Sequence, residues 1–539
     1  MTRIPICLAL LLCASQVFAG PFHDQAIAES LVPIRPGAPG KTPFWNLYAR
    51  RFIYAPAFDF STVPGAACYR FTASSRAGER SFEADLPWAP LSPIWPDLPV
   101  GKVSLKVIAL DRKGGKPIGT AGEKVFYRSA VFDGPYGKPV VDYKESARRA
   151  LFALFHKAEI QSWIRDGKPD PGYTLNCYPA KVMGATVLGM TIYARLASDP
   201  AEAEAALLAA RRAADFLIGL SEPAGRPFEY FPPTYWNGVR PGPHPVFPER
   251  MMMHYPADAA LAYLDLYDRV HDRRYLEAAK RIANTYRKTQ RPDHVWPLVA
   301  RVDSGEPIGP NLLSPTLPIM LMDRLVDQYG FKEYAPLAEA AFRWIMENQV
   351  KRFNWDAQFE DSRPLDPYVN LSREQACDVA IRLLKRNASD PKSVALAEEL
   401  LRFSEDQFVV WEKPLAEWKE IASSGCDPTR DGSTWFTPVV LEQYRCYGPV
   451  ARSMGIMISA WQAAYKVTGK PIYLAKAESL ANSLTIAQEF WKEGTYPTWV
   501  RSNPGEKWLN NTVHTARLML DFAQRSTGGI RGRYSHSHR

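Results

Sequence analysis

Several acidic residues lie beside aromatic residues, a setting that prepares a carboxyl group for acid–base chemistry. Glu412 follows Trp411, and Glu360, Asp361 and Glu442 each lie within two residues of a phenylalanine or a tyrosine. Apolar neighbours desolvate a carboxylate and raise the pKa of the acid. Hydrolysis of a glycosidic bond needs two carboxyl groups on opposite sides of that bond. We therefore expect Glu412 to protonate the leaving oxygen, and Glu360, Asp361 or Glu442 to act as base or nucleophile.

His254 and Tyr255 fit a second chemistry. β-Elimination from a uronic acid needs a base that removes the C5 proton, and a histidine or a tyrosine can serve as that base. It also needs a hydrogen-bond donor or a cation against the sugar carboxylate, for which Asn176, Asn237 and Arg301 are candidates. A polysaccharide lyase acting on acidic glycans is therefore an alternative to a glycoside hydrolase, and a non-catalytic glycan-binding protein is a third.

A set of aromatic and polar residues in the same segments is suited to binding a sugar. Aromatic rings stack on the C–H faces of sugars, and the polar side chains bind hydroxyl and carboxylate groups. The candidate substrate-binding residues are Asn176, Lys181, Trp236, Asn237, Trp296, Arg301, Trp355, Trp411, Trp435, Tyr447, Arg452, Trp508 and His514. We expect the tryptophans at 236, 296, 411 and 508 to lie on one rim of the molecule.

Helices are the elements that must bring these residues together. From Lys144 onward, apolar residues recur with helical periodicity. The predicted helices are Lys144–Lys157, Ala180–Ala197, Ala201–Leu220, Met252–Val270, Arg274–Gln290, Thr316–Gln328, Glu333–Val350, Arg373–Leu384, Ser393–Gln407, Pro449–Val467, Ile472–Trp491 and Asn511–Ala523.

The connections between these helices alternate in length. Short turns follow the even-numbered helices and much longer segments follow the odd-numbered ones, so all the long loops emerge at one end of an antiparallel bundle. Six such hairpins can close into a ring. The even-numbered helices, with stretches such as Met183–Met190 and Met454–Ala460, are apolar around most of their circumference and should form the inner layer. Their N-termini would then face the long loops and favour an anionic ligand.

Residues 42–133 differ from the rest of the chain, because they read as β-strands. Tyr69–Ala73, Val103–Ala109 and Lys124–Tyr127 alternate apolar with polar residues and are separated by proline-rich turns. The segment Trp95–Lys102 resembles the corresponding turn of fibronectin type III-like domains. We expect an N-terminal β-sandwich of the fibronectin III or immunoglobulin type, followed by a helical domain over residues 140–526.

The first residues have the layout of a secretory signal peptide. An early arginine precedes an apolar run, Ile4–Leu12, and Val17-Phe18-Ala19 forms a small-residue cleavage pattern. We expect cleavage after Ala19 and a secreted or periplasmic protein. Residues 527–539 are expected to form a disordered tail.

The amino-acid composition limits the kinds of partner that the protein is expected to bind. The formal net charge is +9, but the basic residues are scattered rather than clustered, so we do not expect the protein to bind nucleic acid. Among specific anionic partners, an acidic glycan is the one we expect. No later segment is apolar enough for membrane insertion. Two of the seven cysteines, Cys7 and Cys13, lie in the predicted signal peptide, and the remaining five have no CxxC spacing. The sequence contains neither a nucleotide-binding motif nor the HExxH motif of zinc proteases. We expect neither a metal nor a cofactor.

The helical part, from about Lys144 to Ala523, resembles the six-hairpin glycosidase superfamily of (α/α)6 toroids. The resemblance lies in the repeated Tyr-Leu-x-x-Ala hairpin starts, at Tyr275 and Tyr473, and in the tryptophan-rich loops. Within that superfamily the chain looks most like secreted bacterial enzymes acting on uronic-acid glycans, such as the exo-β-glucuronidases. The resemblance implies a β-glucuronidase-like hydrolase but assigns no residue. From their charge, we expect Lys181, Arg301 or Arg452 to hold the sugar carboxylate.

Overall fold

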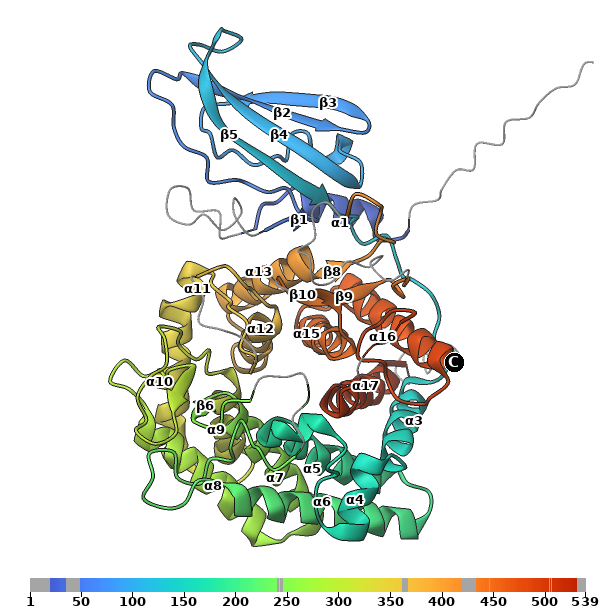
Figure 1. Cartoon of the computed structure of the whole chain (residues 1–539). Helices are drawn as coiled ribbons and strands as arrows, with labels where there is room; N and C mark the ends of the chain where they lie inside the picture. The colour runs from blue at the N-terminus through green and yellow to red at the C-terminus, as the bar shows by residue number, and fades with distance from the viewer. Residues whose placement is uncertain are drawn as a thin grey trace, which may run out of the picture.

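The computed structural model describes residues 20–34, 49–239, 242, 246–360, 367–418, 433–444, 446–503, 505 and 507–530. Most of these residues form a closed ring of paired helices (Figure 1). The inner helices are α5 (Pro179–Leu196), α7 (Tyr255–Val270), α9 (Thr316–Asp327), α12 (Glu374–Arg386), α15 (Ala451–Thr468) and α17 (Leu509–Ile530). Each inner helix packs on the next, and α17 packs back on α5.

An outer layer of helices surrounds this ring. It consists of α3 (Tyr143–Phe155), α6 (Pro200–Leu220), α8 (Arg273–Thr289), α10 (Ala335–Glu347), α13 (Pro391–Phe408) and α16 (Pro471–Trp491). Each outer helix packs mainly on one inner helix, and α3 pairs with α17 at the other end of the chain. The arrangement confirms the predicted (α/α)6 toroid, with the even-numbered predicted helices on the inside.

The remaining elements are short and lie in the connections. They are α1 (His23–Ser30), α4 (Ala158–Asp166), α11 (Gln349–Arg352), β6 (Arg250–Met252), β7 (Val299–Arg301), β8 (Val409–Val410), β9 (Val439–Gln443), β10 (Cys446–Pro449) and the 3-10 helices η1 (Trp95–Asp97), η2 (Thr174–Cys177) and η3 (Lys332–Tyr334). Among the described residues, no helix combines the length and the apolar character needed to cross a bilayer.

Three of the predicted helices differ from the structure by more than an offset of one or two residues at an end. The helix expected from Met252 begins at Tyr255, because Met252 ends β6 and pairs with Val299 of β7. The helix expected over Glu333–Val350 is divided among η3, α10 and α11. Helix α17 continues to Ile530, four residues into the segment expected to be a tail. The predicted signal peptide and residues 531–539 lie outside the described residues.

Small residues allow the inner helices to pack closely. Nearly all of α5 is buried, as its apolar composition predicts. A Cβ atom on Gly189 would lie 2.6 Å from Cγ2 of Val513 on α17, well inside van der Waals contact. The glycine therefore permits the helix–helix approach that closes the ring.

Aspartates in the short turns start several of the outer helices. Asp199, Asp272 and Asp390 are the N-cap residues of α6, α8 and α13, and each carboxylate accepts a hydrogen bond from a backbone N–H of the first turn. Such caps stabilise a helix by about 1 kcal/mol each. The short turns thus end one helix and begin its partner within a few residues, which keeps each pair antiparallel.

The N-terminal region forms one five-stranded sheet in the order β1-β5-β4-β2-β3. Its strands are β1 (Arg51–Phe52), β2 (Cys68–Ser75), β3 (Gly78–Ala84), β4 (Gly101–Leu110) and β5 (Pro117–Arg128). Alternate residues of β4 are buried and exposed, so one face is apolar and the other faces solvent. The β character of this region is confirmed. Among its described residues, however, there is no second sheet, and loops with Phe58 and Trp95 cover the apolar face where a sandwich would place one.

A buried polar network fixes the sheet to the ring. The Arg51 guanidinium of β1 donates to the carbonyl oxygens of Asp406 and Val409, at 2.9 and 2.6 Å. The Asp406 carboxylate in turn accepts the backbone N–H groups of Ile53 and Tyr54, at 2.6 and 2.8 Å. Arg51 and Asp406 are only about 1% exposed, so these bonds replace water on both sides of the contact.

Replacement of Arg51 by leucine should destabilise the protein. The Asp406 and Val409 carbonyls would be left buried without their donor, and each such loss costs about 1–3 kcal/mol. Urea unfolding should therefore show a free energy of unfolding lower by about 2–5 kcal/mol. The neighbouring Arg50 is exposed, so Arg50→Leu is the matched control and should change the stability far less; equal effects of the two variants would contradict this account of the interface.

Candidate functional site

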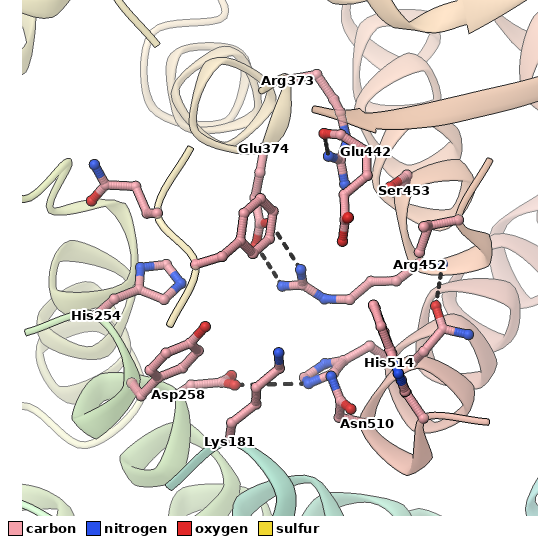
Figure 2. Close-up of a pocket in the computed structure, with 16 residues that line it drawn as sticks. Lys181, His254, Asp258, Arg373, Glu374, Glu442, Arg452, Ser453, Asn510 and His514 are labelled. Carbon is pink, nitrogen blue, oxygen red and sulfur yellow. Dashed lines mark hydrogen bonds and ion pairs between the residues drawn. The ribbon is translucent and has the colours of Figure 1, made fainter. Parts of the chain in front are cut away.

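Two adjoining hollows lie at the pole of the ring where the inner helices begin. Their volumes are about 30 and 60 Å³. Both are lined by Lys181, Phe359, Glu442, Trp508 and Asn510. Figure 2 shows the side chains around the first hollow. Since most ligand pockets measure roughly 300–1,000 Å³, side chains at the mouth must move when a sugar ring enters.

Five of the inner helices place a residue of their first turn in these hollows. They contribute Lys181 of α5, Tyr255 of α7, Glu374 of α12, Arg452 of α15 and Asn510 of α17. The first turn of a helix carries unpaired N–H groups and a partial positive charge. Five converging N-termini therefore give this pole a positive electrostatic contribution that does not depend on side chains.

Glu374 and Arg452 form the strongest contact of the site. Two parallel hydrogen bonds join the Arg452 guanidinium to the Glu374 carboxylate, at 2.8 and 2.5 Å. Burial alone would raise the pKa of Glu374, but the charge and hydrogen bonds of Arg452 outweigh burial and lower it to about 2. Glu374 is therefore ionised at neutral pH, and both of its oxygens are bound to Arg452.

Lys181, Tyr255 and Glu360 form a second cluster. The Lys181 ammonium donates to one oxygen of the Glu360 carboxylate at 2.5 Å, and the Tyr255 hydroxyl donates to the other. Tyr235 also donates, at 2.6 Å, to the backbone carbonyl of Glu360. Burial would raise the pKa of Glu360, but Lys181 and the hydrogen bonds lower it below its usual range. Glu360 is thus a fixed carboxylate that orients Lys181 and Tyr255.

Asp258 and His514 face each other from α7 and α17. Oδ2 of Asp258 and Nε2 of His514 are 3.7 Å apart, which is too long for a hydrogen bond. Burial raises the pKa of Asp258 to about 6. Burial, with help from Arg452 and Arg517, lowers the pKa of His514 to about 3. At neutral pH the contact is therefore between a largely ionised carboxylate and a neutral imidazole, and not an ion pair.

Glu442 enters the same space from the opposite side. It lies on β9, lines both hollows and is 9% exposed. In Figure 2 its carboxyl group points into the hollow from above, while that of Asp258 lies below it and points across toward His514. Its backbone carbonyl accepts a hydrogen bond from the Arg373 guanidinium, which fixes β9 to the start of α12. The site thus presents two carboxyl groups across one cavity.

The structure brings together eight of the residues singled out in the sequence. Glu360, Glu442, His254, Tyr255, Lys181, Arg452, Trp508 and His514 line one or both hollows. His254 is buried, and burial lowers its pKa to about 4, so it is neutral at physiological pH. Asp361 and the side chain of Tyr447 lie outside the described residues.

Glu412, the preferred acid, lies elsewhere. Its carboxylate accepts a hydrogen bond from the backbone N–H of Ala130, at 3.3 Å, at the contact between the sheet and the ring. Burial raises its pKa, as its aromatic neighbour suggested, and nearby Arg51 opposes that effect. It lines neither hollow. The structure therefore places Glu412 at the contact between the sheet and the ring and not in either hollow, and burial raises its pKa there as its aromatic neighbour suggested.

Several tryptophans expected to bind sugar pack inside the protein instead. Trp296 donates to the Tyr286 carbonyl, Trp411 stacks on Trp461, and both are at most 2% exposed. Trp355 is fully buried, Trp435 packs edge-on against Trp418, and Trp236 packs edge-on against Phe216. Only Trp508, among the four expected on one rim, lines the described hollows.

The expected polar ligands outside the ring helices are also displaced from the hollows. Asn176 is buried and donates to the Asp170 carbonyl at 3.2 Å. Asn237 is exposed, and Arg301 is exposed beside Asp303 at 3.4 Å. None of the three lines a hollow, so the cations available there are Lys181, Arg373 and Arg452 among the described residues.

The sequence reasoning missed Arg373 and Glu374, and did not select Asp258 as catalytic. All three occupy the N-cap or the first turn of a predicted inner helix. A charged residue at the N-cap or in the first turn of a predicted inner helix is the signal that could have found them. Within the described residues, no group of three or more His, Cys, Asp or Glu side chains is arranged to hold a metal ion.

Comparison with known proteins gives structural neighbours only. No family model and no curated protein matches the chain. A family 76 glycoside hydrolase from a bovine Bacteroides thetaiotaomicron strain is 11% identical with a TM-score of 0.47, over 85% of this chain and 93% of that chain. A cellobiose 2-epimerase from Spirochaeta thermophila is 12% identical with a TM-score of 0.46, over 71% of this chain and 98% of that chain. An unsaturated glucuronyl hydrolase specific for heparin is 11% identical with a TM-score of 0.43, over 71% and 98%.

Replacement of Glu374 by glutamine should destabilise the protein strongly. The change leaves the partly buried Arg452 charge without its carboxylate, and the loss of one partner of such a pair costs about 3–5 kcal/mol. Urea unfolding monitored by circular dichroism measures the loss. The double variant Glu374→Gln/Arg452→Met removes both charges and should recover part of the stability; a double variant no more stable than Glu374→Gln would argue against a coupled pair.

Proposed function

We propose that the chain is a carbohydrate-active enzyme that hydrolyses glycosidic bonds in saccharides containing uronic acids. The observation that supports this proposal is the pair of carboxyl groups, Asp258 and Glu442, that line one hollow, Glu442 above and Asp258 below in the view of Figure 2. Hydrolysis by two carboxyl groups requires this arrangement, with the sugar between them. The neighbouring Glu374 is less suited to either role, because Arg452 binds both of its oxygens.

The surroundings of the two groups favour separate roles. Burial raises the pKa of Asp258 to about 6, so at neutral pH it is mostly ionised and still basic enough to accept a proton efficiently. We assign Asp258 as the base that removes a proton from the attacking water. Glu442 lines both hollows, and we assign it as the acid that protonates the leaving oxygen as the glycosidic bond breaks. One water is consumed and two hydroxyl groups are formed.

The charges around the hollows support an acidic sugar. Lys181 and Arg452 are cations in the first turns of α5 and α15, where the helix dipole disfavours them. They are compensated by Glu360 and Glu374, so a substrate carboxylate would meet cations already held in position. The net charge of +9 favours the approach of such a glycan. Export, which the N-terminal residues suggest, would place the enzyme where extracellular glycans occur.

Replacement of Asp258 by asparagine should abolish hydrolysis while the protein remains folded. Loss of a general base typically costs 10²–10⁴-fold, so kcat should fall by roughly that factor. Release of reducing sugar from uronic-acid oligosaccharides measures the effect. The matched control is Asp356→Asn, because burial also raises the pKa of Asp356 to about 6 but this residue lines neither hollow. Full activity of Asp258→Asn would remove this residue from the mechanism.

The pH dependence of hydrolysis should report Asp258. A base works only when ionised, and the ionised fraction of a group with a pKa of about 6 rises tenfold per pH unit below that value. We therefore expect kcat/KM to climb with pH and level off above about pH 6. A profile that instead falls as the pH rises through 6 would make Asp258 the acid and exchange the two roles.

A polysaccharide lyase is the second candidate. His254, Tyr255 and His514 line the same hollow, and burial keeps both histidines neutral at pH 7 and able to accept a proton. Elimination creates an unsaturated sugar that absorbs in the ultraviolet, whereas hydrolysis of a saturated substrate does not. We expect reducing ends to appear without ultraviolet absorbance; equal growth of both signals would favour the lyase, and binding of the glycan with no turnover by any preparation would favour a binding protein.

A further inference from the structure

A third cavity runs through the centre of the ring behind the two hollows. Its volume is about 690 Å³. Its walls include the first residues of α9 and α12, Thr316 and Glu374, and also their last residues, Asp327 and Arg386. The cavity therefore extends along both helices, over about 20 Å for α12. Asp327 and Arg386 are exposed, so this cavity, which we call the bore, opens to solvent at the pole opposite the long loops.

Four residues separate the bore from the first hollow. Asp258, Glu374, Arg452 and His514 line both spaces. Glu374 and Arg452 are bound to each other, whereas Asp258 and His514 approach only to 3.7 Å. Asp258 therefore borders both the bore and the first hollow, and Glu442 borders only the hollows among these three spaces.

The walls of the bore can hold water along its length. Arg382 pairs with Asp323 at 3.0 Å, and Arg386 pairs with Asp327 at 2.5 Å, near the far opening. Ser459, in the middle of α15, lines the central part beside apolar residues. Polar groups at intervals are what a hydrated internal passage requires, since each buried water needs two to four partners.

A saccharide seated in the hollows would occupy the long-loop side of Asp258. The water that attacks the sugar must lie on the side of the base, away from the leaving group held near Glu442. The bore borders Asp258 on the side opposite the long loops. Its far opening is separated from the sugar by about the length of α12. It could admit a water molecule without requiring the saccharide to move.

We propose that the bore is a rear solvent channel that delivers the attacking water to Asp258 while a saccharide fills the hollows. This inference rests on the proposed hydrolysis. A water from the bore gives a proton to Asp258 and its oxygen to the anomeric carbon; Glu442 gives a proton to the departing sugar. Asp258 then returns its proton to water in the bore, and Glu442 regains one from solvent when the product leaves.

A cysteine in the bore tests whether the passage is open, without any need for activity. In Ser459→Cys, the new thiol faces the central part of the bore, whereas Cys68, Cys177 and Cys377 are buried among the described residues. Iodoacetamide should alkylate the introduced thiol of the folded variant clearly faster than the buried thiol of Cys377, as measured by mass spectrometry of the peptides containing residues 459 and 377. Alkylation of the introduced thiol no faster than that of Cys377 would overturn the channel.

A bulky side chain at the same position tests whether the passage serves catalysis. Ser459→Trp should lower kcat by about tenfold, less than the loss of a base would cause, and leave KM nearly unchanged because the hollows are intact. Ser459→Ala is the matched control and should keep both constants; thermal unfolding verifies that the tryptophan variant is folded. A folded Ser459→Trp with the parent kcat would overturn the proposal. If the parent itself hydrolyses no uronic-acid saccharide, the proposed function fails, and the alkylation result still decides whether the bore is open.

Discussion

The contact between α17 and α5 closes the ring, and the whole loop-bearing pole depends on it. Closure joins the last helix pair to the first, so Lys181 and Asn510 line the same hollows although more than 300 residues separate them. The contact needs small side chains, as Gly189 against Val513 illustrates. Because the helices alternate in direction, a closed ring necessarily gathers the N-termini of all its inner helices at one pole.

That geometry explains the unusual electrostatics of the site. Converging helix N-termini attract anions, yet the chain also places Lys181, Arg373 and Arg452 there. The carboxylates of Glu374 and Glu360 compensate Arg452 and Lys181 through short hydrogen bonds, and the negative charge of Glu374 also acts on Arg373. Charged side chains of both signs therefore surround Asp258. Burial, which raises the pKa of Asp258, nevertheless has a larger effect on that pKa than the neighbouring cations, which lower it.

The sequence predicted the ring well, because periodicity and loop length depend on the local order of residues. It also identified Lys181, Arg452 and His514, which lie in the first or second turns of inner helices whose positions follow from the ring. It did not locate Trp411 and Glu412, which line neither hollow, since an aromatic neighbour indicates burial but does not say which buried region a loop enters. The single sheet was not foreseen either, because strand alternation reveals one apolar face and not what covers it.

The contact between the N-terminal sheet and the ring affects whether the N-terminal region could be exchanged or removed. Arg51 holds the Val409 carbonyl of β8, β8 pairs with β9, and β9 carries Glu442. The N-terminal region thus supports, through β8 and β9, the wall of the hollows that carries Glu442. A protein engineer who exchanged it for another module, or trimmed it to obtain a minimal toroid, would be altering the geometry of the cavity itself.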